Sequence, residues 1–252
     1  MKDCGNNDYD AELNMIQAVI AVLEGLGIAC WIDQGTLLGL VRDGRLLPKD
    51  WDHDIDIGVW ASQFFPRRKQ ACLTLNSMGF HVKQKNVDQV TLDRGSEYRP
   101  VSIAIYRRSG DRARKWYNSN QTRPSNTAFR MLRRLARIFE APPSNWVPMR
   151  GQRTLHNLLV GRLFSILPST IRLNAARFFR FVATENPSLI LVQTPGKHFE
   201  LCDRLVVDDV SLPIPSDTSG YLVLKYGVDW QMPRKEWNHL LDDGGVDKSN
   251  VT

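Results

Sequence analysis

The sequence has no long apolar run and few cysteines. No hydrophobic stretch approaches the roughly 20 residues that span a bilayer, and the N-terminal MKDCGNNDYDAE lacks the basic-then-apolar order of a signal peptide. The four cysteines are far apart and form no C-x-x-C pair, so a zinc site or a disulfide framework is not indicated. We expect a globular cytoplasmic protein with reduced cysteines.

Acidic residues are nearly missing from residues 107–180. That segment holds sixteen lysines and arginines against only Asp111 and Glu140, which leaves the rest of the chain net acidic. Apolar residues there recur at intervals of three and four with arginines between them, which predicts basic amphipathic helices over 127–139, 154–167 and 170–182.

The remainder of the chain alternates between helical and strand patterns. Helices are predicted over 11–26, from residue 36, over 62–78 and over 216–226. Strands are predicted over 28–32, 54–59, 80–85, 89–93, 101–106, 201–207 and 211–214. This alternation predicts an α/β or α+β protein with a sheet flanked by helices. We divide it into a core (1–108), a basic helical insert (109–190) and a C-terminal segment that completes the core (191–252).

The most informative stretch is DQGTLLGLVR, followed by WDHDIDIG. In a regular strand Asp52, Asp54 and Asp56 would share one face, with neighbours about 6.6 Å apart. Asp54 and Asp56 could then hold one hard cation, whereas Asp52 and Asp56 would be too far apart to do so. Carboxylates that repel one another without a cation favour a site for Mg²⁺ or Mn²⁺.

The residues before this acidic run suit a phosphate group. Gly35 follows a predicted strand and lets the backbone approach a ligand, and Thr36 starts a helix whose N–H groups and hydroxyl could bind an anion. Arg42 supplies a two-pronged donor for phosphate oxygens. The sequence therefore predicts a metal and phosphate site.

Three neighbouring residues have alternative interpretations. Asp33 is either the N-cap of the short helix or a site residue. His53 would point away from the aspartates, so we interpret it as a packing residue or as one that supports a ligand from behind. Trp51 fits a pocket wall or the core.

These motifs resemble the LicD/fukutin phosphotransferases, whose signature reads approximately D-G-T-L-L-G-x-x-R followed by W-D-D-D-I-D-I-G. The sequences VSIAIYRR and LPIPSDTSGYLVLKYGVDWQMP are similar to the family's third strand and closing segment. The resemblance implies a nucleotidyltransferase-like mixed sheet. It also implies metal-dependent transfer of phosphocholine or a polyol phosphate from a CDP-activated donor to a hydroxyl of a cell-surface glycan, or of its lipid-linked precursor.

The resemblance also implies roles for individual residues. Asp54 and Asp56 would bind the divalent metal, and Asp52 would stand at the edge of the catalytic site. The donor phosphates would lie on Gly35, Thr36 and Arg42.

One residue departs from the family pattern. Where the family's third strand usually carries an aspartate, this sequence has Ala104. Either another carboxylate takes that place, for which Asp52, Asp93 and Glu97 are candidates, or the site uses one metal only, or its activity is weakened.

Two other functions remain as alternatives. Ala104 is compatible with a catalytically silent relative that still binds nucleotides. The basic segment could instead belong to a nucleic-acid-directed nucleotidyltransferase or to a nucleic-acid binder, but it has few aromatic side chains for stacking and no recognised nucleic-acid-binding module. A basic amphipathic segment is more typical of contact with the inner face of an anionic membrane, or of a helical cap whose arginines face solvent.

Overall fold

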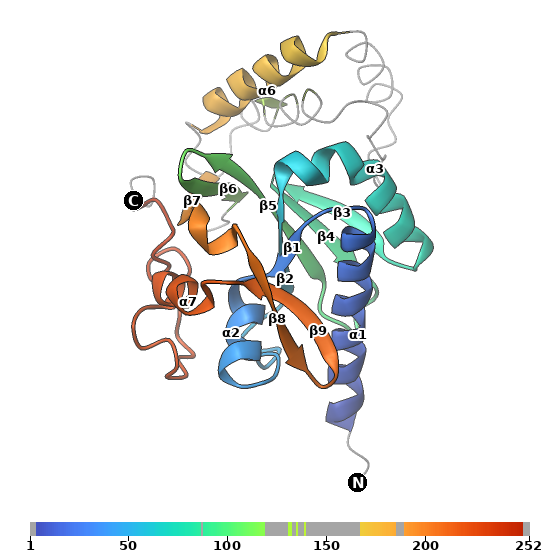
Figure 1. Cartoon of the computed structure of the whole chain (residues 1–252), viewed down its shortest axis with the longest axis vertical. Coiled ribbons are helices and arrows are strands. Elements are labelled where there is room, and N and C mark those ends of the chain that lie inside the picture. Colours follow the sequence, from blue (N-terminus) through green and yellow to red (C-terminus); the bar gives the residue numbers. More distant parts are fainter. Residues whose placement is uncertain are drawn as a thin grey trace.

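The fold is described from a computed structural model (Figure 1). It describes residues 4–86, 88–118, 167–184 and 189–248, together with positions 131, 132, 135 and 139. Its helices are α1 (Cys4–Gly25), α2 (Gln34–Arg42), α3 (Ala61–Ser77), α6 (Ser169–Thr184) and α7 (Thr218–Tyr226), with a 3-10 helix η2 (Gly196–Phe199). Its strands are β1 (Cys30–Ile32), β2 (Ile55–Trp60), β3 (His81–Asn86), β4 (Gln89–Asp93), β5 (Val101–Ser109), β6 (Arg112–Asn118), β7 (Leu189–Pro195), β8 (Cys202–Val207) and β9 (Val210–Pro215).

In the described residues, seven strands form one mixed sheet. Strands β1, β2, β5, β4 and β3 follow one another in that order, β6 pairs with β5, and β7 pairs with β6. Strands β2 and β5 run parallel, and the other pairs in this sheet are antiparallel. The predicted mixed sheet flanked by helices is confirmed.

Strand β2 is central because its sequence, IDIGVW, buries all six residues between β1 and β5. A continuous buried run is expected of a strand that is covered on both faces. Beside it, the indole of Trp31 stacks on Phe199, with 4.6 Å between ring centroids. Gly58 opposes Trp31 in the ladder and leaves room for this ring.

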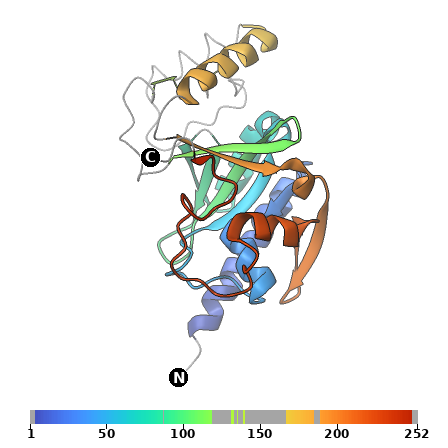
Figure 2. The same ribbon diagram turned by 90° about the vertical axis from the view of Figure 1, so that its left-hand side faces the viewer.

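Helices and the C-terminal segment lie on different sides of this sheet. Helix α3 packs on β2, β3 and β5 and also contacts α1, which reaches β1 and β9. Figure 1 shows α1 and α3 on one side of the strands and the segment after α7 on the other. In Figure 2 that segment passes in front of the strands, with α1 behind. Because α1 and α3 lie on one side of the sheet, the other side is available for a site.

The expected helical insert over 109–190 differs from the structure at both ends. Strand β6 forms a hairpin with β5 and pairs with β7, so residues 112–118 and 189–190 belong to the sheet. The sequence of β6, RARKWYN, is rich in arginine and lysine. Its apolar residues give clear support neither to the two-residue period of a strand nor to the 3.6-residue period of a helix, so the strand was not predicted. The helix predicted over 170–182 corresponds to α6. Helices predicted over 127–139 and 154–167 lie outside the described residues, apart from four positions in the first and residue 167 in the second.

None of the helices in the described part of the chain combines the length and the apolar character that a membrane crossing requires.

We predict that Gly58→Ala destabilises the protein by about 1–3 kcal/mol, the usual cost of overpacking a core. A methyl group there would lie 2.3 Å from indole atoms of Trp31, whereas no atom lies within 4 Å of one added at Gly25. Gly25→Ala is therefore the matched control and should be neutral or slightly stabilising, since alanine favours helices. Urea unfolding of both variants measures this, and equal stability of the two would contradict the packing of Trp31.

Candidate functional site

Asp33 begins the site region as the N-cap of α2. Its carboxylate accepts a hydrogen bond from the Gln34 backbone N–H at 3.0 Å. It also accepts from the hydroxyl of Tyr106 at 2.7 Å and from that of Tyr221. Burial, followed by the charge of Asp33, raises the pKa of both phenols well above the ordinary value. Of the two alternatives for Asp33, the structure shows the cap, and it places this carboxylate in the core.

Three further carboxylates lie together at the start of β2. Each of Asp52, Asp54 and Asp56 offers an oxygen, and these oxygens all lie within 4.8 Å of one another. We expected a regular strand to keep Asp52 away from Asp56. That expectation is wrong because β2 begins only at Ile55, and the irregular backbone before it brings Asp52 back toward Asp56. We call these three residues the carboxylate cluster.

Neighbouring residues hold the carboxylate cluster in place. The Asp56 N–H donates to the hydroxyl oxygen of Thr36 at 2.9 Å, and the hydroxyl of Ser102 donates to Asp54 at 2.6 Å. The amide of Gln89 in turn donates to the Ser102 oxygen at 3.1 Å. A Cβ atom on Gly35 would lie 2.4 Å from a carboxylate oxygen of Asp52, so glycine is required for this approach.

The crowding of these carboxylates shifts their titration. Burial, and then the charge of Asp54, raises the pKa of Asp52 to about 7. Burial, and then the charges of Asp54 and Asp52, raises the pKa of Asp56 well above its ordinary value. A divalent cation would relieve this repulsion, and three convergent carboxylate oxygens are the donors that Mg²⁺ and Mn²⁺ prefer. The cluster therefore fits such an ion.

The carboxylate cluster forms part of a pocket of about 760 Å³. One wall comes from α2, from the loop of residues 43–54 that carries Asp52 and Asp54 (the acidic loop), and from strands of the sheet. The opposite wall comes from residues 226–243. The lining side chains include four tryptophans and a tyrosine, namely Trp51, Trp116, Trp230, Trp237 and Tyr226. Residues from the first half of the chain and from its C-terminal segment therefore line the same pocket.

The other residues predicted for the site differ in their placement. Gly35 and Arg42 line the pocket, whereas Thr36 is buried behind Asp56. The Arg42 guanidinium donates to both oxygens of Asp43, at 2.8 and 2.7 Å. His53 is exposed rather than packed and does not line the pocket.

Ala104 lines the pocket where the family pattern has an aspartate. Of the three carboxylates considered as replacements, Asp52 lines the same pocket. Asp93 instead pairs with Lys83 at 2.7 Å, and Glu97 is exposed; neither contributes to the pocket lining.

Sequence reasoning missed several polar residues of the pocket. Asp88, Lys115 and Asp243 are buried and line it. Their positions in the sequence carry no motif, because each reaches the pocket from a different part of the chain. The similarity of the segment YGVDWQMP to the family's closing segment was the available signal for the C-terminal wall.

A buried ion pair anchors the C-terminal wall. The Lys225 ammonium on α7 donates to Asp243, and both side chains are almost fully buried. The other Asp243 oxygen accepts from the Gly245 N–H at 2.8 Å. Because Asp243 lines the pocket, this pair connects α7 to the wall that faces the carboxylate cluster.

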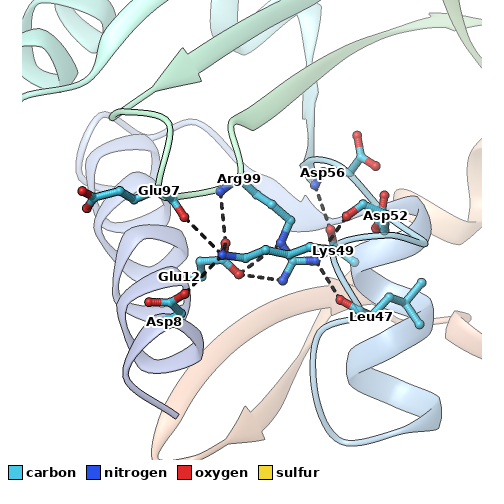
Figure 3. A network of polar contacts seen from close by, with 9 residues as sticks. Asp8, Glu12, Leu47, Lys49, Asp52, Asp56, Glu97 and Arg99 are labelled. Carbon is cyan, nitrogen blue, oxygen red and sulfur yellow. Dashed lines mark hydrogen bonds and ion pairs between the residues drawn. The ribbon is translucent and has the colours of Figure 1, made fainter. Parts of the chain in front are cut away.

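The acidic loop is fastened to α1 through Arg99 (Figure 3). The Arg99 guanidinium donates to Glu12 at 2.6 and 3.0 Å, and the Arg99 N–H donates to the same carboxylate at 3.0 Å. Another guanidinium nitrogen donates to the backbone oxygens of Leu47 and Asp52, at 2.9 and 3.5 Å. Burial tends to raise the Glu12 pKa, but the hydrogen bonds and charge of Arg99 bring it below the ordinary value. The pair therefore sets the path of the loop that carries Asp52.

The comparisons with known proteins agree with the first motif. Residues 27–150 match the family model described as LicD/FKTN/FKRP, nucleotidyltransferase domain. The predicted family is thus confirmed, and the chain carries a nucleotidyltransferase domain of the LicD/FKTN/FKRP family. A stretch of 42 residues is 43% identical to ribitol 5-phosphate transferase FKRP of Mus musculus and of Homo sapiens. This match spans 17% of the chain and only 8% of either relative.

Two solved structures have distant similarity. The crystal structure of ANT(2")-Ia in complex with adenylyl-2"-tobramycin is 14% identical with a TM-score of 0.33, and the alignment covers 68% of this chain and 98% of that one. The STING-associated CdnE c-di-GMP synthase from Capnocytophaga granulosa is 11% identical with a TM-score of 0.31, covering 72% and 66%. Similarity at this level carries no argument about activity.

We predict that Arg99→Met destabilises the protein by about 3–5 kcal/mol, because it leaves the buried Glu12 carboxylate unpaired. Since the Glu12 pKa is lowered by folding, the pair contributes stability above the ordinary carboxylate pKa, and this is lost as the pH falls through the lowered value. Urea unfolding measures both effects.

The double variant Glu12→Met/Arg99→Met should regain much of that stability, since it leaves no unpaired charge. The exposed pair of Lys83 and Asp93 provides the control, and Lys83→Met should cost less than about 1 kcal/mol. If Arg99→Met were no worse than Lys83→Met, Arg99 would not anchor the loop.

We also predict that Asp52→Asn stabilises the metal-free protein at pH 8. The folded-state pKa of about 7 lies above the ordinary value, so the contribution of Asp52 to stability is greatest at low pH and is lost as the pH rises through 7. The gain from Asp52→Asn should shrink toward pH 4. Thermal unfolding in a chelator measures it, with the exposed Asp111→Asn as control. A gain that does not change with pH would refute the shifted pKa.

Proposed function

We propose that this protein is a metal-dependent transferase. It moves phosphocholine or a polyol phosphate from a CDP-activated donor to a hydroxyl of a cell-surface glycan or its lipid-linked precursor. The observation that carries this proposal is the carboxylate cluster, whose oxygens converge within 4.8 Å in a pocket of about 760 Å³. The family match supports a phosphate-group transferase, and the pocket is large enough for a nucleotide and part of an acceptor.

In this proposal Asp54 and Asp56 hold Mg²⁺ or Mn²⁺, and Asp52 completes the ligand set or acts beside it. A bound cation would neutralise charge on the diphosphate and on the CMP that leaves. Gly35 and Arg42 line the pocket and suit the donor phosphates. Thr36 acts indirectly, because its hydroxyl oxygen already accepts the Asp56 N–H and so fixes that carboxylate.

The reaction follows from the chemistry of a CDP-linked donor. The acceptor hydroxyl oxygen attacks the phosphorus that bears the choline or polyol. The bond from that phosphorus to the oxygen bridging the two phosphates breaks, and CMP leaves with the bond's electron pair. The hydroxyl proton needs an acceptor. We assign this role to Asp52, because it lines the pocket, whereas Asp93 and Glu97, the other two candidates for the missing carboxylate at position 104, do not.

One observation favours a second candidate function. Ala104 brings no carboxylate to the pocket, which would suit a relative that binds a nucleotide and metal without catalysing transfer. Metal-dependent release of CMP separates the two proposals, because a silent relative would be stabilised by the donor but would release no CMP.

The test is a thermal-shift screen of CDP-choline, CDP-glycerol, CDP-ribitol, and UDP- and GDP-sugars, with and without Mg²⁺. A ligand at 100 times its Kd should stabilise the folded state by about 2.7 kcal/mol. We expect a CDP-alcohol to shift the melting temperature most, and only with Mg²⁺. The strongest binder is then assayed for CMP release in the presence of a glycan acceptor. Stabilisation by UDP- or GDP-sugars alone would refute a CDP donor.

Within that assay, Asp54→Ala and Asp56→Ala should each abolish the Mg²⁺-dependent shift and CMP release. Their metal-free stability should fall little, because removing one carboxylate also removes repulsion. Asp111→Ala, in an exposed turn, is the matched loss of one carboxylate and should behave as the parent. A double variant of Asp54 and Asp56 that retained transfer would end the metal assignment.

A further inference from the structure

A buried lysine of the pocket has no hydrogen-bond acceptor in the described part of the chain. Lys115 comes from β6, its side chain is 7% exposed, and it lines the pocket. Its ammonium lies 3.6 Å from an Asp33 oxygen and 4.8 Å from the centre of the Tyr106 ring. An ammonium has three N–H donors, and the Asp33 contact is longer than a hydrogen bond.

Asp33 cannot readily come closer, because its carboxylate is already engaged by α2 and the core. It accepts from the Gln34 N–H and from the hydroxyls of Tyr106 and Tyr221. These bonds fix both oxygens where the helix and the core require them. The described residues therefore hold the ammonium at the pocket through a nearby charge and an aromatic face, and none of them accepts a hydrogen bond from it.

A second buried lysine shows what a structural ion pair looks like in this protein. Lys225 is also almost fully buried, but its ammonium donates directly to Asp243. The Lys115 ammonium makes no such hydrogen bond within the described residues, and it lines the pocket. The difference between these two lysines indicates that the N–H donors of Lys115 are available to a ligand of the pocket.

The carboxylate cluster restricts what that ligand can be. The charge of Lys115 acts on Asp56, so the ammonium and the cluster influence the same part of the pocket. An anion there is repelled by three carboxylates unless it shares a cation with them. Phosphates and diphosphates bind Mg²⁺ jointly with protein carboxylates. Ala104, which lines the same pocket with only a methyl group, leaves room for such a group.

We propose that the Lys115 ammonium binds a phosphate oxygen of a metal-bound diphosphate, on the side of the pocket that Ala104 leaves open. This assignment deepens the proposed function, on which it rests for the identity of the donor. Lys115 then supplies positive charge where the family pattern would place another carboxylate. The pocket would use one cation held by the carboxylate cluster together with one fixed ammonium.

The test uses inorganic pyrophosphate, which contains the diphosphate but no base or alcohol. Its affinity is measured by calorimetry with saturating Mg²⁺ for the parent, Lys115→Met and Lys83→Met. Lys83 lies in the same sheet, is exposed and pairs with Asp93, so it controls for the loss of one positive charge. We expect Lys115→Met to weaken pyrophosphate binding at least tenfold and Lys83→Met to change it less than twofold.

A second measurement needs no variant. Acetylation of lysines in the parent protein, mapped by mass spectrometry, should be slowed at Lys115 by Mg²⁺ with pyrophosphate and left unchanged at Lys83. If Lys115→Met does not fold, this protection still decides the matter. Absence of protection at Lys115 despite measurable binding would overturn the assignment.

Failure of this inference can be told apart from failure of the proposed function. If the parent releases CMP from a CDP-alcohol but Lys115→Met binds pyrophosphate as the parent does, the transferase proposal stands and the Lys115 assignment is wrong. If no CDP-alcohol is a donor but Lys115 is still needed for pyrophosphate binding, the diphosphate site stands and the donor must be another diphosphate.

Discussion

The buried pair of Glu12 and Arg99 is the interaction on which the candidate site depends. Arg99 precedes β5, Glu12 belongs to α1, and the guanidinium also reaches the backbone of Leu47 and Asp52. One side chain therefore connects the N-terminal helix, the sheet and the acidic loop (Figure 3). Without such an anchor, repulsion among three carboxylates would drive an irregular loop away from β2. The fold supplies the restraint that opposes this repulsion.

The pocket combines negative and positive groups on separate supports. The carboxylate cluster stands at the start of β2, Lys115 reaches in from β6, and the pair of Lys225 and Asp243 holds the facing wall. A cation bound by the carboxylate cluster would neutralise much of the negative charge there, so that an anion could bind beside it. A metal-bound diphosphate satisfies both parts at once, which is the physical basis for proposing phosphate-group transfer.

The sequence predicted much of the core because its signals are local. The apolar run of β2 and the capped start of α2 depend on near neighbours in the chain, and so do the period of α3 and the turn residues around β4. Strands β6 and β7 were missed because their pairing partners, rather than their own patterns, make them strands. The placement of Asp52 was missed for a related reason, since a regular strand was assumed where the chain bends.

By itself, the sequence determined the mixed α/β class, the family of the nucleotidyltransferase domain, and the residue types that make a metal and phosphate site plausible. Those conclusions rest on residues close together in the chain. Only the tertiary structure decided that Asp52 joins Asp54 and Asp56, that Thr36 supports a carboxylate, and that residues 226–243 form the far wall. It also brought Lys115 into the pocket, where none of the described residues accepts a hydrogen bond from its ammonium. These arrangements depend on contacts between distant segments, and no local pattern encodes such distances.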